Sequence, residues 1–313
     1  LLVAPEQTSP GRLRGVRSII SHELAHMWFG NSVSPTFWHE LWLNEGFATW
    51  LADFVAIESK WSSAERRSVA VAKQRVMRLD AKDSVRAVRQ PIQTKGDIEN
   101  AFDGITYRKG AALLWMVHEW LGADVFRNVL QQYVKRHAHQ TATTQKLINV
   151  FEQLTDKQVG KMLNPLLDLS GVPKLAFDLT CNPGAKPLLT IQQENLRGSE
   201  HREVPWHVPV CVRYRLGERT SKTCFEIQDA MAKVALDSPR CPDWFHPNAD
   251  EVGYYSWRLP SLWVSRLTDY AEQLTELEQA ALPQNLRRIA EAGRLPLVNY
   301  VTALTTWMQS NEW

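Results

Sequence analysis

The sequence predicts a mainly α-helical, multi-domain protein that contains one small antiparallel β-sandwich. Its 313 residues exceed one ordinary domain and suggest two or three. Apolar residues recur at helical spacing as far as Ser170-Gly171-Val172-Pro173, alternate with a period of two from Leu175, and return to helical spacing after Pro260. We therefore expect three domains, over residues 1–174, 175–259 and 260–313.

The first part is expected to be a series of amphipathic helices. The first covers residues 17–29 and ends at a Gly30-Asn31 cap, and a later helix runs through Tyr107 to a stop at Gly122. Ser62-Ser63-Ala64-Glu65 resembles a capping box at a helix start. The other expected helices cover residues 40–60, 62–79, 125–138, 144–154 and 161–169.

The middle part alternates as strands do, with Pro, Gly and Asn turns between them. Segments 208–216 and 220–227 form an expected hairpin around Gly217-Glu218, and this register places Cys211 opposite Cys224. The further expected strands cover residues 175–179, 188–191 and 234–236.

All four cysteines lie in this β module. Four cysteines allow three disulfide connectivities, and four buried reduced thiols are the alternative. An even count confined to one module favours disulfides, and with them a periplasmic or secreted protein over a cytoplasmic one. The cysteines are Cys181, Cys211, Cys224 and Cys241.

The composition is that of an ordinary globular protein, with 44% hydrophobic and 22% charged residues. A net charge of +2 gives no reason to expect a nucleic-acid partner. Because no run of 18 apolar residues occurs, no transmembrane helix is expected. Four of the 13 tryptophans, which we expect to serve core packing, are Trp28, Trp38, Trp42 and Trp50.

The strongest functional signal is His22-Glu23-Leu24-Ala25-His26, followed by Glu45. Histidines at i and i+4 lie on one helix face, about 5–6 Å apart, so both can reach one metal ion. A catalytic zinc site takes three protein ligands and leaves a position for water, and Glu45 supplies the third ligand. Glu23 points away from the two-histidine face and can take a proton from that water.

Two simpler interpretations fit this pattern less well. A surface helix with two solvated histidines would not need a glutamate at a fixed downstream spacing. A purely structural zinc site is four-coordinate and usually contains cysteine, and no cysteine precedes Cys181.

Residues 21–51 resemble the core of the aminopeptidase N family of gluzincin zinc aminopeptidases. That family carries HExxH, 18 intervening residues and a glutamate in an NEGFA-type motif, which stands here at residues 44–48, and a WFGN-type run, which stands at residues 28–31. A second match covers residues 102–110, where Tyr107 occupies the position of the family's catalytic tyrosine.

This resemblance implies a thermolysin-like helical catalytic domain, then the β-sandwich, then the beginning of a C-terminal helical domain. It implies one zinc ion per chain on His22, His26 and Glu45, with Glu23 as the general base. Tyr107 would stabilise the oxyanion. The expected substrates are peptides with a free N-terminus.

The sequence departs from the family at its N-terminal end. The family's N-terminal β domain is absent, and so is the GAMEN-type loop whose glutamate holds the substrate's amine; the chain does not begin with Met. We therefore expect a fragment of a larger enzyme, with little aminopeptidase activity of its own. The alternatives are a related gluzincin hydrolase, either epoxide hydrolase-like or an endopeptidase, and a non-catalytic interaction module. The intact Glu23 argues against the last.

Other candidate residues have weaker support. Thr49 lies one turn after Glu45 and could hydrogen-bond its carboxylate. His118 shares a helix face with Tyr107 but is expected to be a core residue. His39 lies between the two expected zinc helices, where a surface role or a role in supporting a metal ligand fits as well as a catalytic one. His137 and His139 are expected at a helix end, where they favour the helix dipole.

Overall fold

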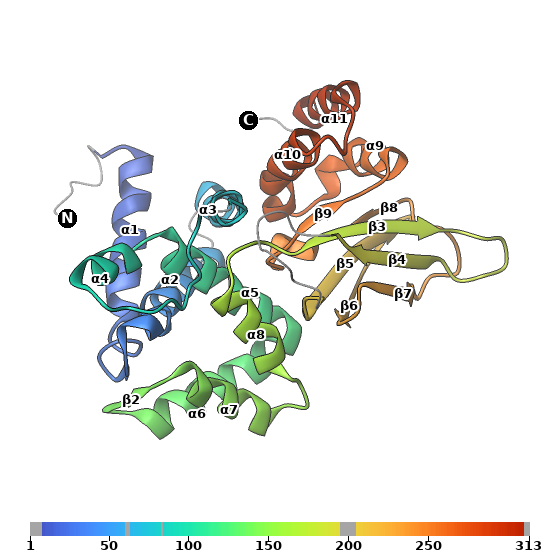
Figure 1. Cartoon of the computed structure of the whole chain (residues 1–313). Helices are drawn as coiled ribbons and strands as arrows, with labels where there is room; N and C mark the ends of the chain where they lie inside the picture. The colour runs from blue at the N-terminus through green and yellow to red at the C-terminus, as the bar shows by residue number, and fades with distance from the viewer. Residues whose placement is uncertain (1–7, 60–62, 83, 195–204, 310–313) are drawn as a thin grey trace. The chain divides into compact units, whose positions relative to one another are not determined.

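The computed structural model describes residues 8–59, 63–82, 84–194 and 205–309 (Figure 1). Helices predominate and smaller, largely antiparallel sheets accompany them, which confirms the mainly α, multi-domain prediction. The chain forms two compact units, residues 1–76 with 86–170 and residues 77–85 with 171–313. In the described part of the chain, no helix combines the length and apolar character that a membrane crossing needs.

The first unit is built from helices joined by short turns. Its two short strands, β1 and β2, pair in parallel, so that Val33 lies opposite Gln140. The elements that begin in this unit are α1 (Pro10–Ala25), β1 (Val33–Pro35), η2 (Trp38–Glu40), α2 (Trp42–Glu58), α3 (Ser63–Asp80), α4 (Lys95–Ala101), η3 (Ile105–Lys109), α5 (Gly110–Leu121), α6 (Ala123–His137), β2 (Gln140–Ala142), α7 (Thr144–Leu154) and α8 (Val159–Asp168).

The predicted bounds of the first helix are wrong at both ends. Helix α1 already begins at Pro10, because Ser9 caps it and proline is favoured in the first turn. It ends at Ala25, where the chain enters a tight turn, and not at Gly30. Gly30 has a φ of +131° and closes this turn with a hydrogen bond from its N–H to the Val33 carbonyl, so its backbone freedom serves the turn after the helix.

The core of the first unit forms around α2, which packs against α1 and α5. Phe47 is fully buried and stacks on Phe29 with the ring centroids 4.4 Å apart. Trp42 and Trp50 are buried as expected, but core packing is wrong for Trp28 and Trp38, which are 51% and 50% exposed. Trp28 lies in the turn that follows α1, and Trp38 begins the short helix η2.

The second unit contains two sheets. Their strand orders are β7-β4-β3-β9 and β6-β5-β8, and every pairing is antiparallel except that of β3 with β9. The strands are β3 (Lys174–Thr180), β4 (Leu188–Gln193), β5 (Val208–Leu216), β6 (Arg219–Ile227), β7 (Met231–Ala235), β8 (Trp244–His246) and β9 (Ser256–Arg258). The same unit holds η4 (Ala249–Glu251), α9 (Ser261–Asp269), η5 (Ala271–Gln273), α10 (Glu276–Glu291) and α11 (Leu297–Gln309).

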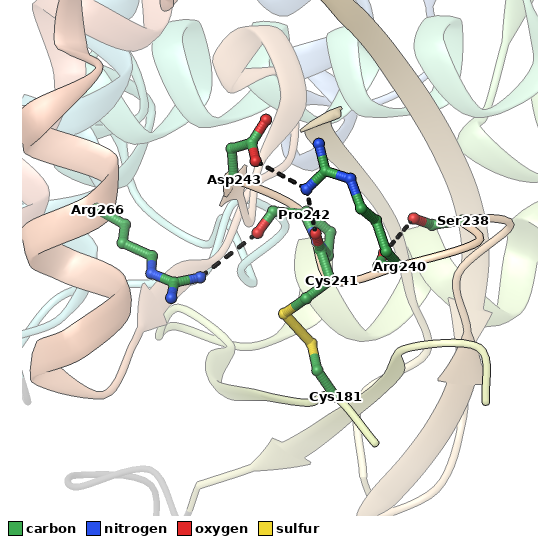
Figure 2. Close-up of a disulfide and its surroundings, with 7 residues drawn as sticks. All are labelled: Cys181, Ser238, Arg240, Cys241, Pro242, Asp243 and Arg266. Carbon is green, nitrogen blue, oxygen red and sulfur yellow. Dashed lines mark hydrogen bonds and ion pairs between the residues drawn. A yellow bond between two sulfur atoms is a disulfide. The ribbon is translucent and has the colours of Figure 1, made fainter. Parts of the chain in front are cut away.

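Two disulfides cross-link this β module. The predicted hairpin register is confirmed: Cys211 pairs with Cys224 across β5 and β6, and the two are bonded. Cys181 is bonded to Cys241, beside which Arg240 donates to the Asp243 carboxylate at 3.0 Å (Figure 2). Each bond links two residues that are separated in the sequence, and so it reduces the number of conformations open to the unfolded chain.

Candidate active site

His22, His26 and Glu45 meet at one point in the first unit. His22 lies in the last turn of α1, His26 caps that helix, and Glu45 lies in the first turn of α2. Glu45 Oε2 is 3.1 Å from His22 Nε2 and 3.6 Å from His26 Nε2, and one donor atom from each residue falls within 4.8 Å of the others. Two ligands of a tetrahedral zinc ion are about 3.3 Å apart, given bond lengths of about 2.0–2.2 Å, so this donor set fits zinc.

The turn after α1 orients the second histidine. His26 Nδ1 lies 3.0 Å from the Phe29 carbonyl oxygen, an arrangement that leaves Nε2 facing Glu45. The turn packs against α2 at Gly30, where a Cβ atom would come within 2.5 Å of the Asn44 side chain. Glycine at this position therefore allows the histidine and Glu45 to approach one another.

A second close approach places Tyr107 beside this group. Gly46 and Gly110 let α2 and α5 come together, because a Cβ on either would lie 3.1–3.2 Å from the other's backbone. Tyr107 lies in the π-helical turn η3, which directly precedes α5. Its ring stacks on His22 with the centroids 5.7 Å apart, which places the phenol next to the candidate metal ligands.

The start of the π-helical turn is fixed by an ion pair that the sequence did not reveal. Asp103 accepts hydrogen bonds from the backbone N–H groups of Ile105 and Thr106 at 2.9 and 3.1 Å. Arg86 holds Asp103 through two nitrogens and also donates to the Thr106 hydroxyl. These contacts determine where the turn that carries Tyr107 begins.

The surroundings of Tyr107 favour its neutral form. Burial raises the pKa of its hydroxyl well above the ordinary value, and the carboxylates of Glu45 and Glu23 raise it further. A neutral phenol can donate a hydrogen bond, whereas a phenolate cannot.

Glu23 lines a pocket of about 200 Å³ next to these groups. His22 and Tyr107 line the same pocket, so the structure brings the expected base, a metal ligand and the phenol to one cavity. Glu23 itself is exposed. The remaining lining residues are Ser18, Ile19, Thr49, Ala52, Asp53 and Arg108.

The Asp53–Arg108 pair in this pocket was not predicted from the sequence. Arg108 Nη1 lies 3.1 Å from both oxygens of Asp53. Burial raises the pKa of Asp53, and the Arg108 charge opposes that rise. The spacing of Glu45, Thr49 and Asp53, four residues apart on one helix, is the signal that could have indicated a shared face.

None of His39, His118, His137 and His139 lines this cavity. His118 sits in an aromatic cluster with Trp50, Trp115 and Phe126, which agrees with a core role. His39 stacks on Phe37, and the chain turns at His139 after α6 ends at His137.

Residues 1–166 match the peptidase family M1 domain. The chain is 27% identical over 324 residues to a glutamyl aminopeptidase of Bitis rhinoceros, in a match that covers 99% of this chain and 33% of the relative. It is 26% identical to the alanine/arginine aminopeptidase of Saccharomyces cerevisiae, in a match that covers 100% of this chain and 36% of the relative. It is 25% identical to aminopeptidase M1 of Arabidopsis thaliana, in a match that covers 100% of this chain and 37% of the relative. The chain spans about a third of the length of these relatives.

Proposed function

Because this chain belongs to the M1 family of peptidases, we propose that it forms the zinc-binding core of an aminopeptidase that hydrolyses the N-terminal peptide bond of peptides. The observation that carries this proposal is the convergence of His22, His26 and Glu45 beside a pocket lined by Glu23 and Tyr107. The order of these groups on α1 and α2 also supports a thermolysin-like arrangement of the first unit.

The proposed division of labour follows from the side chains. When bound, zinc lowers the pKa of a coordinated water to about 7 and polarises the substrate carbonyl. Glu23 takes the proton of the attacking water and passes it to the leaving amine. Tyr107 donates its hydroxyl proton in a hydrogen bond to the oxygen on which negative charge develops.

The decisive experiment is metal analysis of the purified 313-residue chain. We expect one equivalent of zinc in the wild-type chain and less than about a tenth of that in His22→Ala, because two ligands hold the ion poorly. His39→Ala is the matched control and should keep its zinc, since His39 stacks on Phe37 outside the group. One equivalent of zinc in His22→Ala would contradict the assignment.

The substrate class needs a separate assay in the full-length protein. An aminopeptidase hydrolyses peptides with a free N-terminus and loses this activity when the N-terminus is acetylated. Cleavage of acetylated peptides at the same rate would indicate an endopeptidase, and binding without hydrolysis would indicate an interaction module.

We also propose that the protein works outside the cytoplasm, in the periplasm or as a secreted protein. The two disulfides of the β module support this proposal, because cytosolic proteins rarely keep structural disulfides. Mass spectrometry of a non-reduced digest of protein from its native source should find both bonds. Four free thiols in that material would refute the proposal.

A further inference from the structure

The pocket next to the candidate metal ligands contains a cation that the proposed chemistry does not use. Arg108 follows Tyr107 directly in the chain and lines the same cavity as His22 and Glu23. Arginine is a cationic side chain with a rigid fork of donors. Any substrate residue that enters this pocket would therefore meet the Arg108 guanidinium, whose charge the Asp53 carboxylate offsets in part.

Asp53 holds this guanidinium by one nitrogen. Arg108 Nη1 donates to both carboxylate oxygens of Asp53, at 3.1 Å each, and the Asp53 side chain is only 12% exposed. The anchored group has lost much of its freedom, so a ligand that binds it orders little more of the side chain.

The other edge of the guanidinium is open. Within the part of the chain that the structure describes, Nε and Nη2 of Arg108 make no hydrogen bond or ion pair, and its side chain is 36% exposed. Together these two nitrogens form the fork that binds both oxygens of a carboxylate in parallel. The pocket of about 200 Å³ is smaller than a site for a drug-sized ligand and is of a size for one side chain.

From this geometry, and on the basis of the proposed aminopeptidase function, we propose that Arg108 makes the enzyme prefer peptides that present a carboxylate to this pocket. That carboxylate comes either from an acidic side chain next to the scissile bond or from the C-terminus of a dipeptide. Arg108 is a specificity-determining residue in this proposal, and Asp53 positions its guanidinium.

Matched substrate pairs in the full-length protein test the proposal. One set compares Glu with Gln at the first or second position of C-terminally amidated tripeptides, and a second compares a neutral dipeptide with its C-terminal amide. A hydrogen-bonded carboxylate on Arg108 should raise kcat/KM about ten- to hundred-fold over the amide in one set, mainly through KM. The set that responds identifies the source of the carboxylate.

Two variants separate recognition from a structural role. Arg108→Gln should reduce the preference to within about threefold, because the charge and the fork are lost. The double variant Asp53→Asn/Arg108→Gln should lose it equally while leaving no buried carboxylate without its partner, which guards against misfolding. Arg127→Gln is the control and should keep the preference, because Arg127 pairs with Asp124 on the surface of α6.

The outcomes distinguish this inference from the proposed function. Hydrolysis of the neutral peptides without a carboxylate preference in the wild type would overturn the inference and leave the aminopeptidase function standing. A preference that survives in both variants would also overturn it, because Arg108 would then serve only to neutralise Asp53. No hydrolysis of any peptide by the full-length protein would refute both.

Discussion

Histidine and glutamate side chains cluster in both units of the protein, but the two clusters differ in what their carboxylates already bind. In the first unit, Glu45 faces two half-buried histidines beside a pocket. In the second unit, His246 is fully buried with Glu251 at 3.6 Å and Glu278 at 3.9 Å.

In the second unit, the two carboxylates already accept hydrogen bonds from other groups of the protein. Glu278 accepts hydrogen bonds from Arg213, from the Asp250 N–H and from the Thr275 N–H. Asn285 donates to Glu251 at 3.0 Å. The two carboxylates also approach different nitrogens of His246, so no single point lies near three donor atoms. In the described part of the chain, His22, His26 and Glu45 are the one group that offers such a point.

We propose that the open cluster of the first unit serves chemistry and that the hydrogen-bonded carboxylates of the second unit serve stability. Loss of an acidic side chain should accordingly lower the rate of hydrolysis in the first unit and the free energy of unfolding in the second. Variants in the two units that lowered the same one of these quantities would contradict this distinction.

The largest expected effect is that of Glu23→Gln on hydrolysis by the full-length protein. In the proposed mechanism Glu23 handles the proton both of the water and of the leaving amine, so kcat should fall by about 10⁴-fold, the upper end for general acid–base catalysis. Zinc content and the unfolding midpoint should stay at wild-type values. Glu99→Gln, on the exposed face of α4, is the control. A loss smaller than tenfold would remove Glu23 from its proposed role.

Next in size is the effect of Glu278→Gln on stability. Its loss leaves the buried Arg213 without a charged partner, so the free energy of unfolding should fall by about 3–5 kcal/mol while the zinc content is unchanged. Glu291→Gln on the same helix is the matched control, because its pair with Arg287 is exposed to solvent and contributes little to stability. Urea unfolding of the two variants measures the difference, and equal midpoints would contradict it.

The pH dependence of stability should differ in the same two variants. Burial acts to raise the pKa of Glu278, but His246 and Arg213 lower it, and the net pKa lies below the ordinary value. A lowered pKa in the folded state gives stability that is present above the unfolded pKa of about 4.3 and is lost as the pH falls through the folded pKa. Glu278→Gln should therefore lose less stability than Glu291→Gln on acidification below about pH 4.

Features of the fold and the candidate site that depend on residues close in the sequence were predicted from local patterns. The 144–154 helix, the Cys211–Cys224 register and the convergence of the two histidines all follow from short-range spacing. Contacts between distant segments were not predictable in this way. The β1–β2 pairing, the Cys181–Cys241 bond and the Arg86–Asp103 ion pair depend on which elements pack together, and spacing along one element does not report that.

Tyr107→Phe should have the smallest of these effects and tests how the open cluster works. The ring remains and can still stack on His22, so zinc binding and stability should change little. Only the hydroxyl is lost, and its hydrogen bond to the developing oxyanion forms mainly in the transition state. We therefore expect kcat to fall about 10²–10³-fold with KM nearly unchanged. Tyr270→Phe, at a half-exposed tyrosine in the second unit, is the matched control. A rise in KM with normal kcat would mean that Tyr107 holds the substrate before reaction, and the open cluster would then owe its catalysis to Glu23 and the metal alone.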